Sequence, residues 1–354
     1  MTISSPPLPD LAALCRERFG RDLMSAERIG KGRNSRVFRM LLAPRGTGEV
    51  EALVVKFYRR DPGDARDRLA TEFGGLQFLW QNGIRAIPEA IAADRERYCA
   101  FYEYLDGDVP DACDATADEI KASVRFLSDL KALRGRPGST ALPTASEACF
   151  SIEAIAHSVT GRVDRLRAAG RGDDAAALHR WLAGTFDPLY ADVVAWCRAT
   201  TATTGVDYDD ELVADRRTLS PSDFGFHNAI RRRDGSLAFV DFEYFGWDDP
   251  AKTLVDFVLH PGMMVPADAA QTFATTFLSA FADDAQLPDR ARLVYPLFGL
   301  KWCTIVLNDF LPARVGAAGA GTTDARETRL RQLASADLMA ARIAREYRHN
   351  PLFA

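Results

Sequence analysis

The sequence predicts an α+β protein with two lobes, a small N-terminal lobe built on an antiparallel sheet and a larger, mostly helical C-terminal lobe. Strand-like apolar and aromatic runs fall within the first hundred residues, and long segments with helical periodicity follow. A chain of 354 residues is also long enough for two lobes that share a cleft. We place the lobe boundary after residue 105, which gives lobes of residues 1–105 and 106–354.

The N-terminal lobe is expected to open with a short helix over DLAALCRERF, for which Asp10 is the candidate N-cap. Two strands follow in RVFRMLLA and VEALVVKFYRR, joined by the turn-rich connection PRGTGE. Apolar residues at helical spacing predict a helix over residues 66–84. The compact aromatic run YCAFYEYL is typical of a strand, and DGDVPD ends it.

The C-terminal lobe is predicted to be helical in three consecutive segments, residues 117–133, 151–170 and 173–199. Short strand and loop segments come next, around residues 218–248, and they carry the polar motifs described below. The remainder returns to helical character.

Composition and charge indicate which binding partners and which cellular compartment to expect. A net charge of −5 gives no electrostatic reason to expect nucleic acid or an anionic membrane surface. The six cysteines are scattered, with no CxxC pair, which favours reduced thiols over disulfides or a zinc site. The N-terminus lacks the pattern of a signal peptide, and no window approaches the ~18 apolar residues of a membrane span. We therefore expect a cytoplasmic protein without nucleic-acid or membrane partners.

The segment IGKGRNSRVF places Gly30 and Gly32 directly before the first predicted strand. Two such glycines allow a backbone to approach a ligand closely, so that successive N–H groups can bond phosphate oxygens. An ordinary turn before a strand has the same pattern. The segment is not a P-loop, because no GKS or GKT follows at the required spacing.

Lys56 interrupts the apolar strand LVVKFY, and Glu72 lies sixteen residues later in the predicted helix. A glutamate that pairs with the ammonium would hold the lysine toward a polyphosphate. Alternatively, Lys56 points to solvent from a half-exposed strand and Glu72 is a solvated helix residue.

Two polar motifs follow the helical region, LSPSDFGFHNAI and LAFVDFEYFGWDDPAK. They place Asp223 five residues before Asn228, and Asp241 thirteen residues after Asn228. A carboxylate and an amide carbonyl are oxygen ligands that suit Mg²⁺, while a second carboxylate could orient a hydroxyl and accept its proton. The alternative is an Asx-turn at Asp223 and the end of a hairpin at Asp241. The order of the pieces, from glycine turn to strand-ending aspartate, is the order found in kinase-type phosphoryl transfer.

On DFGFHNAI and LAFVDFEYFGWDDPAKTLVDF the chain resembles the aminoglycoside phosphotransferase and choline kinase superfamily, whose members have a bilobal protein-kinase-like fold. The resemblance runs from about residue 29 to 261. It implies an ATP-dependent enzyme that moves the γ-phosphoryl group to a hydroxyl of a small molecule, with ATP and Mg²⁺ as cofactors. The acceptor it implies is a sugar, an amino-sugar or an amino-alcohol.

The resemblance also implies a role for each matching residue. Asp223 would be the catalytic base, and Asn228 and Asp241 would hold Mg²⁺. The remaining matches would bind the nucleotide: Lys56, paired with Glu72, at the α and β phosphates, Gly30 and Gly32 over them, and the backbone of Glu103 and Leu105 at the adenine edge.

One position departs from the superfamily pattern, because Pro221 stands where the relatives carry a histidine that braces the catalytic loop. His227 could replace that brace or be a partly exposed loop residue. The departure leaves open a kinase-fold protein that binds nucleotide without transferring phosphate, and nucleotidyl transfer on the same fold is a third alternative. The acidic run DYDDELVAD, together with Asp248 and Asp249, could attract a cationic acceptor or be a solvated loop.

Overall fold

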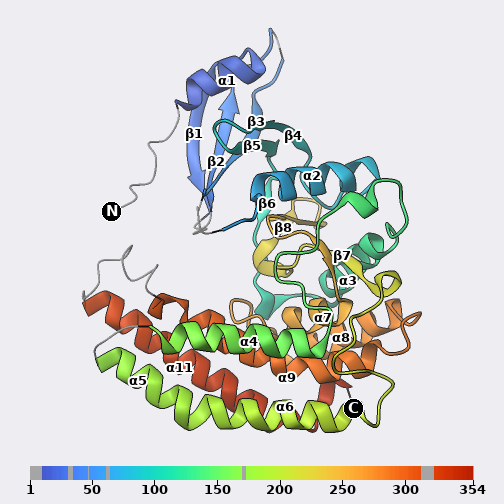
Figure 1. Cartoon of the computed structure of the whole chain (residues 1–354). Coiled ribbons are helices and arrows are strands. Elements are labelled where there is room, and N and C mark those ends of the chain that lie inside the picture. The colour runs from blue at the N-terminus through green and yellow to red at the C-terminus, as the bar shows by residue number, and fades with distance from the viewer. Residues whose placement is uncertain are drawn as a thin grey trace. The chain divides into compact units, whose positions relative to one another are not determined.

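A computed structural model of the chain describes residues 10–30, 35–46, 48–60, 64–169, 173–311 and 323–353 (Figure 1). The chain divides into two compact units, each built from more than one segment. Unit 1 takes its described residues from Met1–Asp111, Asp129–Glu147 and Leu219–Trp247. Unit 2 takes them from Ala112–Ser128, Ala148–Thr218 and Asp248–Ala354.

A five-stranded antiparallel sheet with the order β1-β2-β3-β5-β4 forms the first part of unit 1. Its strands are β1 (Leu23–Ile29), β2 (Ser35–Leu42), β3 (Glu51–Tyr58), β4 (Ala90–Asp94) and β5 (Cys99–Glu103). β3 and β5 lie within the strand segments predicted from the sequence, and β2 begins one residue before its predicted segment, RVFRMLLA. β1 and β4 were not predicted, and both are edge strands that pair with a single neighbour.

Helix α1 (Leu11–Phe19) covers one face of this sheet, as Figure 1 shows. Asp10 caps the helix as predicted, since its carboxylate accepts hydrogen bonds from the amides of Ala12 and Ala13. Leu14 and Cys15 pack into a core with alternate residues of the strands. The strand members of that core are Phe38, Met40, Leu42, Leu53, Val55, Phe57, Cys99 and Phe101.

The same alternation decides where the strand lysine points. Because Val55 and Phe57 face α1, Lys56 between them faces the opposite side of the sheet. Tyr58 and Tyr102 share that side, since Tyr58 lies two residues beyond Lys56 and Tyr102 pairs with Val54. Lys56 is only 5% exposed, so the alternative of a solvent-facing lysine is wrong.

Asp94 at the end of β4 joins α1 to the sheet by accepting hydrogen bonds from Arg18 and Arg97, each at 2.9 Å. Burial opposes its charge, but the Arg97 amide and the two guanidinium groups lower the pKa of Asp94 to about 2. A carboxyl group whose pKa is lowered by folding stabilises the folded state at any pH above its ordinary pKa. That contribution is lost as pH falls toward about 2.

Replacement of this carboxylate is therefore expected to lower the free energy of unfolding by an amount that depends on pH. We expect Asp94→Asn to lower the free energy of unfolding by about 1–2 kcal/mol at neutral pH, because the arginines are partly exposed and screened. The difference from wild type should shrink on acidification below the ordinary carboxyl pKa, as measured by denaturant unfolding. Asp22→Asn, which removes a mostly exposed partner of Arg16, is the control. If the loss in unfolding free energy does not change with pH, the ionised Asp94 carboxylate is not its cause.

Helix α2 (Arg68–Gln81) stands between β3 and β4 in the chain and packs against β4 and β5 within unit 1. It lies within the helix predicted over residues 66–84, and Asp67 caps it by accepting from the amide of Ala70. Gly75 allows Phe245 to approach the helix, because a Cβ at that glycine would lie 2.5 Å from the phenyl ring. Any larger residue at position 75 would push the segment after Asp241 away from α2.

The two polar motifs lie at the open end of a hairpin formed by β8 (Ala229–Arg232) and β9 (Leu237–Phe239). Ala229 pairs with Phe239, and the amide of Val240 donates to the carbonyl of Asn228 at 2.9 Å. The thirteen-residue spacing of Asn228 and Asp241 is therefore that of one antiparallel hairpin. β6 (Gly107–Asp108) completes a three-stranded sheet, and β7 (Thr218–Ser220) pairs with β10 (Gly246–Asp248).

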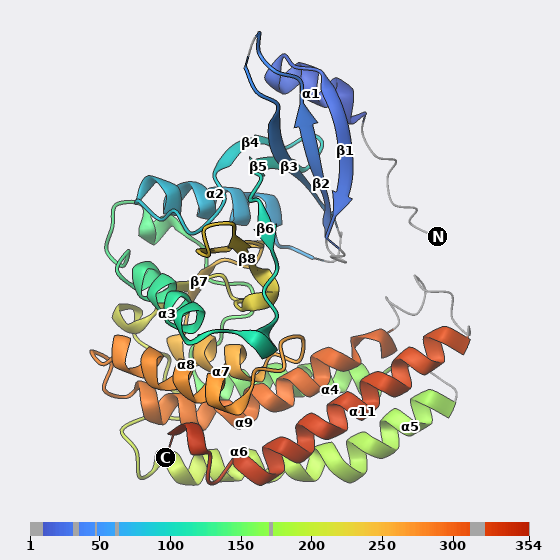
Figure 2. The ribbon, with the colours of Figure 1, turned by 180° about the vertical axis from the view of Figure 1, so that it is seen from behind.

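Unit 2 is helical, as the sequence predicts for this part of the chain. Figure 2 shows α4, α9 and α11 side by side, and their packing forms much of this unit. The predicted helix over residues 173–199 is one helical run with a π-helical turn, η3, between α5 and α6. The main helices are α3 (Ala117–Lys131, which continues into unit 1), α4 (Ile152–Arg167), α5 (Asp173–Trp181), η3 (Leu182–Phe186), α6 (Asp187–Thr201), α7 (Pro250–Leu259), α8 (Ala267–Ala280), α9 (Leu287–Val306) and α11 (Thr323–Glu346).

Short 3-10 turns connect or follow these elements. They are η1 (Ala112–Asp114), η2 (Ser139–Ala141), η4 (Ala214–Arg216), η5 (Phe226–Asn228), η6 (Leu307–Phe310) and η7 (Pro351–Phe353). Among the residues that the structure describes, no helix combines the length and apolar character needed to cross a bilayer.

Two acids for which attraction of a cationic acceptor was one alternative are instead structural. Asp248 is fully buried and bonds Lys252 at 2.8 Å. Asp249 is 4% exposed, caps α7 and accepts a bidentate interaction from Arg290. Because both carboxylates are buried and paired, they cannot belong to a solvent-facing surface that attracts a cation, and that alternative is wrong for these two residues.

Candidate active site

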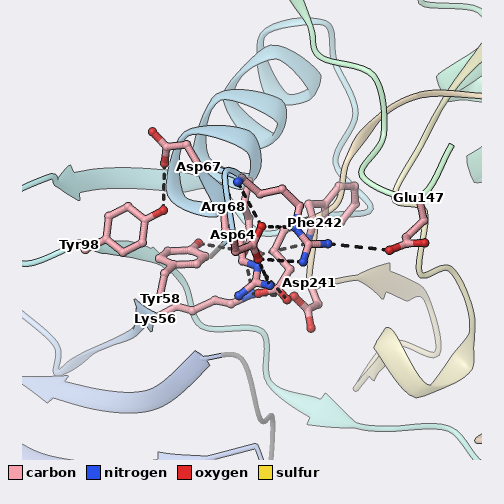
Figure 3. Close-up of polar contacts among 12 residues, drawn as sticks. Lys56, Tyr58, Asp64, Asp67, Arg68, Tyr98, Glu147, Asp241 and Phe242 are labelled. Atoms are coloured by element: carbon pink, nitrogen blue, oxygen red, sulfur yellow. Dashed lines mark hydrogen bonds and ion pairs between the residues drawn. The ribbon is translucent and has the colours of Figure 1, made fainter. Parts of the chain in front are cut away.

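Lys56 lies at the centre of a buried charge cluster in unit 1. Its ammonium is 2.6 Å from Asp241 Oδ1, and Figure 3 shows these two side chains together. Glu72 Oε2 lies 2.7 Å from the same ammonium, and Glu243 Oε2 lies at 3.8 Å. Oxygens of the three carboxylates lie within 4.8 Å of one another. The predicted pair of Lys56 and Glu72 is confirmed as a contact, and Asp241 joins it from the second polar motif.

Glu72 has a hydrogen-bond donor for each carboxylate oxygen. Oε2 accepts from Lys56 and from the Tyr58 hydroxyl at 2.8 Å, while Oε1 accepts from the amide of Phe242 at 3.2 Å. Tyr58 in turn lies 2.6 Å from the hydroxyl of Tyr102. One helix carboxylate thus fixes both the strand lysine and the backbone that follows Asp241.

Ionisation in this cluster follows from its burial and its charges. Burial disfavours an ammonium ion, yet the carboxylates of Asp241 and Glu72 outweigh it and raise the pKa of Lys56 well above its ordinary value. Burial raises the pKa of Glu72, against the effect of the Lys56 charge. The lysine is therefore a permanent positive charge at neutral pH, as contact with phosphate oxygens requires.

Asp241 is held in a backbone conformation that side chains rarely adopt, with φ of +66°. Aspartate tolerates this left-handed region better than most residues, although it costs about 1 kcal/mol or more. Its side chain is 41% exposed, whereas Lys56 and Glu72 are buried. The strained conformation presents a carboxylate that touches the lysine through Oδ1 and also remains accessible to a ligand.

Asp223 and Asn228 contact each other in the loop between β7 and β8. The Asn228 side-chain amide donates from Nδ2 to the backbone carbonyl of Asp223 at 2.9 Å. Because that carbonyl can only accept, the amide nitrogen must face it and the amide oxygen must face away. Asn228 therefore offers its oxygen, the atom that a magnesium ion would need.

The donor set fits a magnesium ion at Asn228 and Asp241. The first offers an amide oxygen, the second a partly exposed carboxylate, and the hydrogen bond from Val240 to Asn228 keeps their backbones adjacent. Two protein oxygens of this kind, completed by water and phosphate oxygens, are the usual environment of Mg²⁺.

The glycine turn and the backbone predicted to contact the nucleotide lie at the ends of strands β1 and β5. Gly30 directly follows β1 with φ of +77°, a conformation that favours glycine, while Gly32 lies outside the described residues. Glu103 ends β5, and its amide donates to the carbonyl of Glu89 at 3.0 Å. Leu105 lies two residues farther and is 9% exposed. Their contacts with adenine stay a prediction.

Sequence reasoning missed four side chains of the cluster. Tyr58 and Tyr102 support Glu72, Glu243 adds a third carboxylate near Lys56, and Arg68 Nε lies 3.9 Å from Glu243 Oε1. The period of two along a strand could have placed Tyr58 on the lysine face. Glu243 stands in the D-F-E-Y motif, two residues after Asp241.

Comparison with known proteins assigns the chain to a family. Residues 25–294 match the phosphotransferase enzyme family, which is more than half of the chain. No curated protein sequence matches significantly. The choline kinase of Streptococcus pneumoniae is 14% identical, with a TM-score of 0.56 over 94% of this chain and 98% of that one.

Two phosphotransferases are similar to the same extent. A spectinomycin phosphotransferase solved with ADP and spectinomycin is 13% identical, with a TM-score of 0.58 over 93% of this chain and 97% of that one. An aminoglycoside phosphotransferase solved with ADP is 14% identical, with a TM-score of 0.58 over 95% and 99%. These likenesses establish a kinase-like fold, as the sequence predicts. With the match over residues 25–294, they show that the chain belongs to the phosphotransferase enzyme family.

Proposed function

We propose that the protein transfers the γ-phosphoryl group of ATP to a hydroxyl of a small molecule. The observation that carries the proposal is the buried contact of Lys56 with Glu72 and Asp241, with Asp241 beside Asn228 at the open end of one hairpin. A permanent cation beside an accessible carboxylate and an amide oxygen suits a metal-bound polyphosphate. Solved relatives with ADP bound support the choice of a nucleotide.

Each residue then has a distinct task in the transfer. Lys56 binds the α and β phosphates, and Glu72 keeps it aimed at them. Asp223 orients the acceptor hydroxyl and takes its proton as the acceptor oxygen bonds to the γ-phosphorus and the bond to the β–γ bridging oxygen breaks, releasing ADP. Asn228 and Asp241 would hold Mg²⁺, which supplies positive charge to the phosphates when bound. The lobe of residues 1–105 would cover the nucleotide, and residues 106–354 would supply the catalytic loop and acceptor pocket.

A small acceptor fits the chain better than a protein acceptor. Only residues 242–249 separate Asp241 from the start of α7 at Pro250, and β10 takes up part of that interval. Protein kinases use a long activation segment here as a platform for their substrate. Relatives described as choline kinase, ethanolamine kinase and spectinomycin phosphotransferase support a sugar, amino-sugar or amino-alcohol as the acceptor. Among the residues that the structure describes no cysteine forms a disulfide, which supports a reducing, cytoplasmic location.

The test is a screen of sugars, amino-sugars and amino-alcohols for acceptor-dependent ADP release from Mg·ATP, with mass spectrometry of the product. A product heavier by one phosphate is expected. A product carrying AMP would instead indicate nucleotidyl transfer. Thermal stabilisation by Mg·ATP without any product would favour the silent nucleotide-binding protein that Pro221 leaves open.

The magnesium assignment predicts a separate effect at Asp241. We expect Asp241→Asn to weaken Mg·ATP binding about tenfold or more, because it removes one metal ligand charge, while binding of ATP in EDTA changes little. Isothermal titration with and without Mg²⁺ measures both affinities. Asp234→Asn, at the exposed tip of the same hairpin, is the matched control. Equal weakening with and without the metal would contradict a metal-binding role.

A further inference from the structure

His227 bonds directly to the proposed catalytic base. Its Nε2 lies 3.0 Å from Asp223 Oδ1, within unit 1, and the two side chains are 22% and 37% exposed. The residues are four apart in sequence, and the short turn η5 (Phe226–Asn228) brings the imidazole back over the carboxylate. The partner in this contact is the proposed base itself.

The chemistry of the two groups determines where the proton lies. An ionised carboxylate is only an acceptor, and an imidazole nitrogen without hydrogen is also an acceptor. A contact of 3.0 Å therefore needs a proton between them. With Asp223 ionised, as a base must be, His227 carries that proton on Nε2 and donates it to Oδ1.

The loop holds Asp223 at two points. Asn228 Nδ2 bonds its backbone carbonyl, and His227 bonds its carboxylate. The residue before the base, Ser222, has φ of +70°, and its amide donates to Ser220 Oγ at 3.0 Å. Pro221 has no amide hydrogen to contribute. The Asp223 carboxylate is thus held in this loop by His227, which follows it in sequence.

We propose that His227 is a positioning residue for phosphoryl transfer, which holds the Asp223 carboxylate through Oδ1 so that the acceptor hydroxyl meets Oδ2. The inference rests on the proposed function and adds to it a residue that acts through the base. In the transfer, the hydroxyl proton moves to Asp223 while the acceptor oxygen bonds to phosphorus and ADP leaves. His227 keeps its proton throughout, and its N–H bond limits rotation of the carboxylate before the proton moves.

Two substitutions separate the hydrogen bond from the volume of the ring. His227→Leu removes the donor at similar size, and His227→Gln retains an N–H that can reach the carboxylate. We expect the leucine variant to lower kcat about 10- to 100-fold, since a hydrogen bond to a charged group is lost. The KM for ATP should stay within about twofold, and glutamine should restore most of the rate. His157→Leu, on the exposed face of α4, is the matched control.

The same leucine change in the Asp223→Asn background tests action through the base. If His227 acts only through Asp223, His227→Leu should change the residual rate of the Asp223→Asn variant less than about twofold. The probe is ADP release with the best acceptor of the screen, or with water if no acceptor responds. Equal losses in both backgrounds, an unaffected leucine variant, or no rescue by glutamine would each overturn the inference and leave the proposed function standing. Absence of transfer by wild type to any acceptor or to water would overturn both.

Discussion

Asp223→Asn is expected to lower kcat by about 10²–10⁴-fold, because the amide has the shape of the carboxylate but cannot accept the hydroxyl proton. Binding of Mg·ATP should change little, since Lys56, Asn228 and Asp241 provide the proposed nucleotide and metal contacts. The hydrogen bond from Asn228 should also survive, because it ends on the backbone carbonyl of residue 223. ADP release measures turnover, and isothermal titration measures nucleotide affinity.

The control for this variant is Asp118→Asn, which removes one charge from an exposed aspartate in the first turn of α3. It should leave turnover and affinity unchanged. Undiminished transfer by Asp223→Asn would remove Asp223 from the role of base. A parallel loss of nucleotide affinity and thermal stability would show that the loop had collapsed, and the loss of rate would then say nothing of proton transfer.

Most of the N-terminal lobe could be predicted from local patterns. The Asp10 cap, strands β2 and β3, helix α2 and strand β5 all have strong periodicity or capping chemistry, and the structure confirms them. β1 could not be found in this way, because LMSAERI is exposed along most of its length and becomes a strand only by pairing with β2. Strand β4 is short and alanine-rich, with weak intrinsic β propensity.

The site was predictable as a set of residues but not as a set of contacts. The sequence indicated that Lys56 and Glu72 pair, and strand alternation confirms the side on which Lys56 lies. It could not show that Asp241 contacts the same lysine, because 185 residues separate them. Nor could it show which group His227 bonds, since that depends on the direction of a single turn of η5. Residue types alone therefore do not predict these contacts. The first depends on how distant parts of the chain pack together, and the second depends on the geometry of a short turn.

Lys56→Met is expected to have the largest effect on stability, because it leaves buried carboxylates without their central cation. Removing one partner of a buried ion pair costs about 3–5 kcal/mol, since the remaining charge loses its compensation. Glu72 and Glu243 are buried, so water cannot replace the ammonium efficiently. We expect a loss of this size in the free energy of unfolding at neutral pH, measured by denaturant titration, together with loss of Mg·ATP binding.

The pH dependence of this variant provides a second test of the same cause. Burial raises the pKa of Glu72 in the folded protein, and removing the opposing lysine charge should raise it further. A carboxyl with a raised folded pKa binds more protons folded than unfolded, so stability should rise as pH falls from about 7 toward about 5. Lys56→Met should therefore recover part of its stability on mild acidification, relative to wild type.

A second substitution separates the electrostatic cause from lost packing. Glu72→Gln added to Lys56→Met should restore part of the lost free energy, because it removes a buried charge without changing side-chain size. Lys121→Met, on the exposed surface of α3, controls for loss of a lysine charge in general. If the double variant is less stable than Lys56→Met alone, and acidification brings no recovery, then Lys56 stabilises the fold through packing rather than by compensating buried charge.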